Sequence, residues 1–503
     1  MKSQSIRFAS LYAALLTYSS PLFPQVQPPQ PIVIDLAAKA TPFPHFWEQS
    51  FGSGRALLTL RESYRNDLRE VKKVTDFRFV RFHAIFHDEL GVYDEDAAGH
   101  PILNFTYVAQ VYDGLLDNGV RPIVEISFMP KKLAARQDLH PFWYKQNVSP
   151  PKDYAKWDAL IRNFAQFLVN RYGIDEVSQW YFEVWNEPNI DFWSGDPKQS
   201  TYFELYDHTA RSLKSVDSRL RVGGPATSSA HWVDDFLAHT AKENVPVDFV
   251  STHGYSDDTV EDLFGTHEDI PIEKRACKAV EKVHNQIKTS PKPNLPLFWT
   301  EWNVSGYGDL RAGDTSYSTT ATAQTIRDCD GSVDILSFWT FSDVFEENGP
   351  ARDPFFGGFG LIAPGGIKKP SFYSFALFHK LGTTRLVNPA ENVLVTRRSD
   401  GWLAIAVWNL SPPTQPGTVR TFDLAFRGLR GSKHISVSRI DADHSNTLAA
   451  YARMGKPRYA TEEQVRLLNE ESALRAPELL SLKNGHLILT LPVNGFALLE
   501  VKP

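Results

Sequence analysis

The sequence predicts a (β/α)8 TIM barrel with an accessory antiparallel β-sandwich domain. From residue 46 to about residue 380, short apolar segments alternate with amphipathic stretches of helical length. Such alternation, with strands that are apolar throughout, is typical of a parallel sheet covered by helices. Eight apolar segments are present, which is the number that closes a barrel. An open doubly wound sheet would carry a glycine-rich phosphate-binding turn after an early strand, and the sequence contains none.

Each barrel element follows from this pattern. Helical periodicity predicts helices such as Phe105–Asn118 and Tyr154–Tyr172, which precede the third and fourth strands. Because the strands are apolar on both faces, they are expected to be buried inside the ring of helices. The predicted barrel strands are Phe46–Gly52, Phe77–Phe86, Arg121–Phe128, Trp180–Pro188, Arg221–Thr227, Asp248–Tyr255, Pro296–Asn303 and Ile335–Asp343.

The chain changes character after the barrel, which is assigned to residues 40–380. Residues 385–503 contain several short strand patterns, and Asn484-Gly485 has the composition of a tight hairpin turn. This pattern predicts a β-sandwich, interrupted by a polar, partly helical insertion at Asn446–Ser472. A strand at residues 32–36 is expected to join it. The predicted strands are Val393–Arg398, Trp402–Leu410, Val419–Phe426, His434–Ile440, His486–Pro492 and Phe496–Val501.

Residues 1–30 have the layout of a signal peptide and a linker. Lys2 and Arg7 precede the apolar stretch Phe8–Leu16, and proline-rich sequence follows. We therefore expect a secreted or periplasmic protein, with a disordered cytoplasmic N-terminus as the alternative. The two cysteines, Cys277 and Cys329, are expected on neighbouring helices, where they either pair or remain buried free thiols. No later segment has the apolar length of a membrane span, so no membrane partner is expected.

Composition narrows the class of partner. Hydrophobic residues make up 42% of the chain and charged residues 22%, which is ordinary for a globular protein. The formal net charge of −6 and the absence of a basic run argue against nucleic acid as a partner. The 12 Trp, 18 Tyr and 33 Phe favour a carbohydrate ligand, since aromatic faces pack against the C–H faces of sugar rings.

Two similar segments carry the chemistry. Trp180–Asn189 and Pro296–Asn303 are both apolar and aromatic, and each places one glutamate, Glu187 or Glu301, at the end of a predicted strand. A buried carboxylate is costly unless the site uses it. Two carboxylates that face each other are the machinery of glycoside hydrolysis, with one as proton donor and the other as nucleophile or base. The pair therefore predicts a sugar-cleaving enzyme.

Other polar residues follow the same edge of the predicted barrel. In this fold the active site lies at the carboxyl ends of the strands, so these side chains are expected to border it. The histidines do not have the spacing of a metal site, and we expect no metal and no cofactor. The candidate substrate-binding residues are His83, Asp88, Asn186, His253, Tyr255, Trp339, Glu346 and Glu347.

Several segments together resemble glycoside hydrolase family 39, a member of clan A of retaining glycosidases. The resemblance rests on Trp185–Asn189, Trp299–Asn303 and Phe338–Glu347, and it extends to Arg81–His83 and Pro354–Leu361. It covers roughly residues 40–500 and is closer to the β-xylosidases of the family than to its α-L-iduronidases. One position departs from the pattern, because Phe356 stands where those β-xylosidases often carry histidine.

The resemblance implies a retaining mechanism. Glu187 would protonate the leaving oxygen and then activate water, and Glu301 would form the covalent glycosyl-enzyme. Asn186 would bind the sugar 2-hydroxyl, and Glu346 and Glu347 would bind two further hydroxyls. The carboxyl groups of Glu187 and Glu301 are then expected about 5–5.5 Å apart.

The sequence thus favours an exo-acting, retaining β-D-xylosidase that releases xylose from the non-reducing ends of xylo-oligosaccharides. One alternative is the same machinery acting on another glycan, such as an arabinoside, a galactoside, a uronide or an exopolysaccharide. The other is a carbohydrate-binding protein that is catalytically silent. The oligomeric state is left open.

Overall fold

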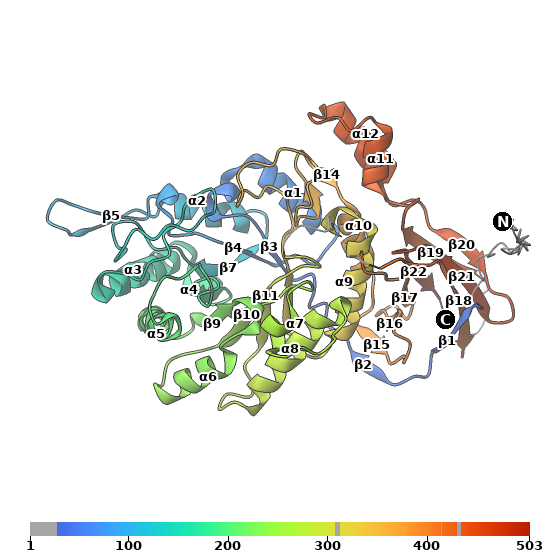
Figure 1. Cartoon of the computed structure of the whole chain (residues 1–503), viewed down its shortest axis with the longest axis horizontal. Coiled ribbons are helices and arrows are strands. Elements are labelled where there is room, and N and C mark those ends of the chain that lie inside the picture. Colours follow the sequence, from blue (N-terminus) through green and yellow to red (C-terminus); the bar gives the residue numbers. More distant parts are fainter. Residues whose placement is uncertain (1–27, 307–311, 414, 430–433, 503) are drawn as a thin grey trace, which may run out of the picture.

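A computed structural model describes residues 28–306, 312–413, 415–429 and 434–502. Eight parallel strands close into a barrel, which confirms the predicted fold class (Figure 1). Each strand pairs with the next one along the chain, and β12 returns to β3. The barrel strands are β3 (Ser50–Gly52), β4 (Phe79–Phe82), β7 (Arg121–Ile126), β8 (Tyr181–Val184), β9 (Arg221–Thr227), β10 (Phe249–His253), β11 (Leu297–Trp302) and β12 (Ile335–Phe338).

Helices surround these strands, as Figure 1 shows. Helix α3 (Tyr154–Tyr172) illustrates why they form: the side chain of Asp153 accepts hydrogen bonds from the amides of Ala155 and Lys156, and Gly173, with φ of 81°, follows the last turn. Its buried residues recur at helical spacing and face the barrel. The remaining helices of the barrel region are α1 (Glu62–Lys72), α2 (Thr106–Leu116), α4 (Ile174–Val177), α5 (Lys198–Val216), α6 (Val233–Lys242), α7 (Val260–Phe264), α8 (Ile272–Thr289), α9 (Ser316–Asp328) and α10 (Pro370–Phe378), with 3-10 turns at Ala56–Leu60, Asp88–Leu90, Ser228–Ala230 and Ala312–Asp314.

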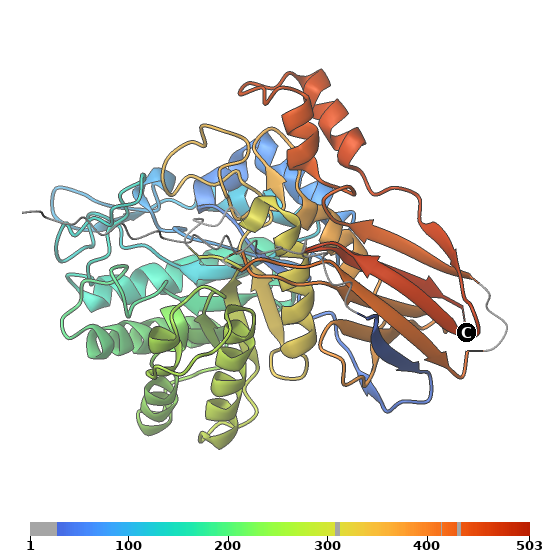
Figure 2. The same ribbon diagram turned by 45° about the vertical axis from the view of Figure 1, so that its right-hand side comes forward.

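A β-sandwich lies beside the barrel (Figures 1 and 2). A seven-stranded sheet of order β2-β15-β16-β17-β22-β19-β20 faces a three-stranded sheet of order β1-β18-β21, with an apolar core between them. All pairs are antiparallel except β1 with β18, which are parallel. The strands are β1 (Gln30–Asp35), β2 (Ala40–Pro42), β15 (Thr384–Leu386), β16 (Val393–Arg397), β17 (Leu403–Trp408), β18 (Arg420–Arg427), β19 (His434–Ile440), β20 (Glu478–Ser481), β21 (His486–Leu491) and β22 (Phe496–Val501).

The sandwich packs against the barrel through helices α9 and α10. The indole N–H of Trp408 donates to Oε1 of Gln324 across 3.1 Å, and the rings of Phe378 and Phe496 meet edge to face at 5.4 Å. These buried aromatic contacts join the outer face of the larger sheet to the apolar core of the barrel.

The insertion within the sandwich forms two helices, α11 (Thr447–Arg453) and α12 (Glu462–Ser472). A capping box at Thr461 and Gln464 begins α12. The ring of Tyr451 packs on Phe355 at 5.0 Å, so the insertion contacts the loop that follows the barrel. Two short hairpins complete the elements: β5 (Tyr93–Glu95) with β6 (Pro101–Leu103), and β13 (Ile362–Ala363) with β14 (Ile367–Lys368).

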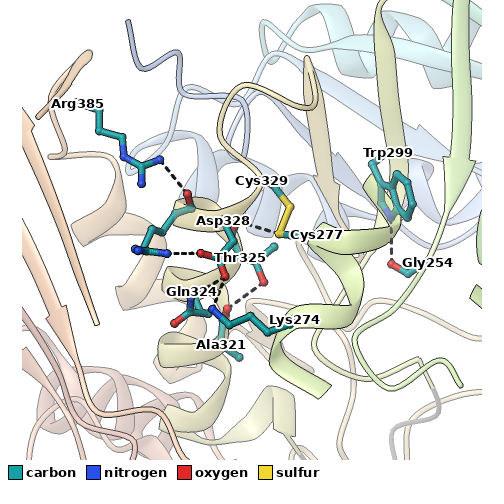
Figure 3. Close-up of a disulfide and its surroundings, with 11 residues drawn as sticks. Gly254, Lys274, Cys277, Trp299, Ala321, Gln324, Thr325, Asp328, Cys329 and Arg385 are labelled. Carbon is teal, nitrogen blue, oxygen red and sulfur yellow. Dashed lines mark hydrogen bonds and ion pairs between the residues drawn. A yellow bond between two sulfur atoms is a disulfide. The ribbon is translucent and has the colours of Figure 1, made fainter. Parts of the chain in front are cut away.

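The two cysteines form a disulfide between neighbouring helices (Figure 3). Cys277 lies in α8 and Cys329 directly follows α9, at a sequence separation of 52. Of the two alternatives that the sequence left open, the structure has the paired one. The expected signal peptide and most of its linker fall on residues 1–27, outside the described residues. Within the part of the chain that the structure describes, no helix is long and apolar enough to cross a membrane.

Candidate active site

A cavity of about 180 Å³ lies at the carboxyl ends of the barrel strands. Polar and aromatic side chains from several strands and loops converge on it, as expected for an active site in this fold. Its described lining consists of His83, Phe142, Asn186, Glu187, Ile190, Phe192, Ser228, Tyr255, Asp258, Glu301, Gly306, Trp339, Glu347 and Phe359.

Glu187 enters the cavity from the loop after β8. Its backbone has φ of 42°, a left-handed conformation that is unfavourable for a residue with a side chain and that occurs preferentially at functional sites. Its amide donates to the carbonyl of Ala226 across 2.8 Å, which fixes this turn. Burial raises the pKa of the Glu187 carboxyl to about 7, although Arg81 and His83 oppose the shift. At neutral pH a large fraction of Glu187 therefore holds a proton that it can donate.

His253 is the last residue of β10 and contacts the Glu187 carboxyl. Its Nδ1 lies 3.0 Å from Oε1 of Glu187. Because burial lowers the pKa of the imidazole to about 4, His253 is neutral at neutral pH and does not hold Glu187 in its ionised form by charge.

Glu301 belongs to β11 and meets a different environment. The guanidinium of Arg81 contacts its Oε1, and the hydroxyl of Tyr255 donates to its Oε2 across 2.7 Å. Burial, and then the charge of Glu301, raise the pKa of Tyr255 well above its ordinary value, so the phenol remains a donor. Two donors thus orient the Glu301 carboxylate.

The two carboxyl groups face each other closely. An oxygen of Glu187 and an oxygen of Glu301 lie within 4.8 Å, and Nδ1 of His253 lies within the same distance of both. Retaining glycosidases hold their carboxyl groups about 5–5.5 Å apart, whereas inverting enzymes leave roughly 6.5–9.5 Å for a water molecule. The geometry matches the retaining arrangement.

Arg81 organises this site, although it was absent from the candidate residues. It is fully buried on β4, and its guanidinium contacts the carboxylates of Glu125 and Glu183 as well as Glu301. Burial alone would lower the pKa of Arg81, but these three carboxylates raise it above its ordinary value. Its Nη2 also donates to Oδ1 of Asn186 across 2.9 Å, which fixes the amide at the cavity wall.

His83 and Glu347 form a second pair of ionisable groups at the cavity. Nδ1 of His83 lies 2.7 Å from Glu125; burial would lower the pKa of His83, but Glu125 raises it to about 9. The other nitrogen, Nε2, lies 3.6 Å from Oε1 of Glu347. Burial raises the pKa of Glu347 to about 8, against the charge of His83. At neutral pH a charged imidazolium and a largely protonated carboxyl can both donate to sugar hydroxyls.

Most of the predicted site residues meet at this cavity. Asn186, Tyr255 and Trp339 line it, and His253 contacts the lining residue Glu187. The indole of Trp339 packs within 4.9 Å of the His83 ring. It also covers Gly52, where a Cβ would come within 1.9 Å of the indole, so only glycine fits there.

Two candidates lie elsewhere. Asp88 is exposed, and its carboxylate accepts from the backbone amide of Lys131 at 3.2 Å. Glu346 is bound by Arg61 and Arg55; burial opposes the shift, but their hydrogen bonds lower its pKa. Neither residue is among the described residues that line the cavity, and their role in binding substrate stays a prediction.

Several aromatic residues of the cavity were not among the candidates predicted from the sequence. Phe142 and Phe192 meet edge to face at 5.3 Å, and the ring of His140 stacks on Phe192 at 4.0 Å. Phe359, rather than Phe356, lines the cavity from the loop after β12. None of these aromatics follows a predicted strand end directly, so strand patterning gave no signal for them.

Two groups of side chains have the composition of metal ligands. Glu187, His253 and Glu301 offer ligand atoms within 4.8 Å of one another, and so do His45 and Glu48, which precede β3, together with His379, which follows α10. In both groups a histidine Nδ1 already bonds a carboxylate. Hydrogen bonding thus accounts for both clusters.

Comparison with known proteins agrees with this geometry. The model of glycosyl hydrolases family 39 matches residues 30–478. The chain belongs to this family. It is 38% identical over 469 residues to a β-xylosidase of Geobacillus stearothermophilus, covering 91% of this chain and 92% of that protein. The crystal structure of a monomeric β-xylosidase from Caulobacter crescentus CB15 superposes with a TM-score of 0.84 at 34% identity, covering 94% of this chain and 99% of that one. The human α-L-iduronidase matches at 28% identity over 164 residues, 30% of this chain and 23% of that protein.

The family places the chain among the glycoside hydrolases, as the paired carboxylates had predicted. The family resemblance noted in the sequence is therefore confirmed.

Proposed function

We propose that the protein is a retaining, exo-acting β-D-xylosidase that releases xylose from the non-reducing ends of xylo-oligosaccharides. The observation that carries this proposal is the approach of Glu187 and Glu301 to within 4.8 Å at the cavity. The similarity to β-xylosidases over most of the chain supports the choice of sugar.

Each half of the reaction follows from the surroundings of the two carboxyl groups. Glu187, with its raised pKa, donates its proton to the glycosidic oxygen while Glu301 attacks the anomeric carbon. The C–O bond to the leaving sugar breaks, and a covalent ester to Glu301 forms. Glu187, now ionised, then takes a proton from water, which displaces Glu301 and releases xylose with its anomeric configuration retained.

Recognition of the sugar falls to the other groups at the cavity. We expect the Asn186 amide, held by Arg81, to bind the 2-hydroxyl, whose hydrogen bond strengthens in the transition state. His83 and Glu347 line the same cavity and are expected to bind further hydroxyls, and Trp339 is expected to offer an apolar face to the ring. At about 180 Å³ the cavity is smaller than the roughly 300–1,000 Å³ of pockets for drug-sized ligands, which favours one sugar ring and hence exo action.

The charges at the cavity disfavour a uronide. Among its described lining residues His83 is the one basic side chain, whereas Glu187, Asp258, Glu301 and Glu347 are acidic. A carboxylate on the terminal sugar would be repelled by the Glu301 carboxylate. Burial raises the pKa of Glu187, Asp258 and Glu347 to between about 7 and 8, so these three carboxyls add little repulsion near neutral pH. A neutral pentose fits this environment better.

A panel of 4-nitrophenyl glycosides tests the proposal. It contains the β-D-xyloside, α-L-arabinosides, the β-D-galactoside and an α-L-iduronide analogue. We expect the xyloside to give the largest kcat/KM, and NMR of the first product to show the β anomer. A dominant signal on another glycoside would reassign the sugar, and an α product would refute retention.

We also propose that the protein works outside the cytoplasm, secreted or in the periplasm. The layout of residues 1–30 and the Cys277–Cys329 disulfide support this location, because disulfides form mainly in oxidising compartments. Fractionation of the source cells, followed by immunodetection, tests it; detection in the cytoplasm alone would refute it.

A further inference from the structure

Three exposed apolar side chains belong to the loops that border the catalytic cavity. Trp143 is 62% exposed, Phe356 42% and Ile190 38%. Ile190 lines the cavity itself, Trp143 directly follows the lining residue Phe142, and Phe356 lies three residues before the lining residue Phe359. Large apolar side chains exposed beside a binding pocket commonly mark a binding surface.

Trp143 is held firmly at this rim. Its amide donates to the carbonyl of Glu347, a residue of the cavity lining, across 2.7 Å. Its indole packs against Gly349, where an added Cβ would lie 3.1 Å from the ring carbon Cε3. One face of the indole thus rests on the turn after Glu347, while most of the ring remains open to solvent. A ring that is fixed and exposed can bind a partner with little loss of conformational entropy.

Phe142, the residue before Trp143, has a different environment. Phe142 points into the cavity and packs against Phe192 at 5.3 Å. The segment therefore supplies an inner ring to the cavity and an outer ring to its rim. On the exo action proposed above, one sugar occupies the cavity, so the next sugar of a bound chain lies at the rim. Aromatic faces bind the C–H faces of pyranose rings.

We propose that Trp143 forms a binding site for the leaving sugar, the pyranose ring on the far side of the bond that is cleaved. This inference rests on the proposed xylosidase function. It predicts that the enzyme uses Trp143 to favour xylo-oligosaccharides over xylosides with a small leaving group.

The test compares two substrates that differ only in the leaving group. Xylobiose carries a pyranose there, whereas β-D-xylosyl fluoride carries a single atom. The variants are Trp143→Ala, Trp143→Phe as the conservative replacement, and Tyr107→Ala as a matched control. Tyr107 is an exposed aromatic residue, 44% exposed, at the start of the peripheral helix α2.

We expect Trp143→Ala to lower kcat/KM for xylobiose about tenfold and to leave that for xylosyl fluoride within about twofold. Trp143→Phe is expected to recover most of the loss, and Tyr107→Ala to change neither substrate. An equal loss on both substrates would show that Trp143 only supports the cavity, and no loss on either would show that the leaving sugar does not contact it. Both results overturn the site while keeping the xylosidase. Failure of the unaltered enzyme on both substrates would instead overturn the proposed function, and this site with it.

Discussion

Replacing Tyr255 by phenylalanine removes one hydroxyl that donates to Oε2 of Glu301 across 2.7 Å. Hydrogen bonds to charged groups contribute roughly 1.5–3 kcal/mol. Their effect on rate depends on how the charge of the acceptor changes along the reaction, because only interactions that are stronger in the transition state accelerate a step. Glu301 loses its negative charge when it attacks the sugar and regains the charge when water displaces it.

The loss should therefore fall on the second half of the reaction. Formation of the glycosyl-enzyme weakens the hydrogen bond from Tyr255, so kcat/KM is expected to stay within about threefold of the unaltered enzyme. Hydrolysis of the glycosyl-enzyme restores the bond, and a loss of about 1.5 kcal/mol in that step lowers kcat about tenfold. The glycosyl-enzyme should then accumulate.

Stopped-flow measurement with 2,4-dinitrophenyl β-D-xyloside separates the two halves, since a burst of dinitrophenolate reports the accumulated intermediate. Tyr112→Phe is the matched control, because the buried hydroxyl of Tyr112 has no hydrogen-bond partner among the described residues. An equal fall of kcat and kcat/KM without a burst, or no change in either, would refute the assignment of Tyr255 to the departing carboxylate.

Three further predictions follow from the site and the disulfide. Glu301→Ala should lower turnover by several orders of magnitude, and azide should restore cleavage with α-D-xylosyl azide as product; a β azide by NMR would overturn Glu301 as the nucleophile. Glu187 must be protonated to act on the substrate and its pKa is about 7, so kcat/KM of a xyloside with a poor leaving group should be full below pH 7 and fall tenfold per pH unit well above it; a flat profile to pH 9 would contradict this role. Cys277→Ala with Cys329→Ala should lower the free energy of unfolding by roughly 3–4 kcal/mol, for a loop of 52 residues, in urea titrations, and an unchanged midpoint would mean that the thiols are not paired in solution.

The barrel was predictable because its strands carry their own signal. All eight are short apolar runs bounded by polar segments, and the described strands lie inside the predicted ranges. The three-residue strands β2 and β15 were missed, since so short a segment has no measurable periodicity. The sequence also could not predict that β1 pairs with β18 in parallel. The alternation of apolar and polar residues shows which face of a strand is buried, but it does not show which strand lies next to it.

The site was predictable where its residues end strands and unpredictable where they come from loops. Glu187 and Glu301 follow apolar runs, so their burial and convergence could be inferred. Asp88 and Glu346 also follow strands, but the loop turns their carboxylates toward partners that sequence spacing does not encode. Arg81 could have been found by the same cost argument as the glutamates, since a charged residue inside a fully apolar strand requires buried partners.

Those buried partners explain how one barrel makes two glutamates chemically different. Arg81 and Tyr255 donate to Glu301, while Glu187 is buried beside the neutral ring of His253. A carboxylate that receives two donors is held in place to attack, whereas one that is buried beside a neutral group keeps its proton near pH 7. Exchanging the two environments would exchange the roles. The division of labour between acid and nucleophile therefore lies in the residues around the pair: burial keeps the proton on Glu187, and Arg81 contacts Glu301 directly but reaches Glu187 only through its field.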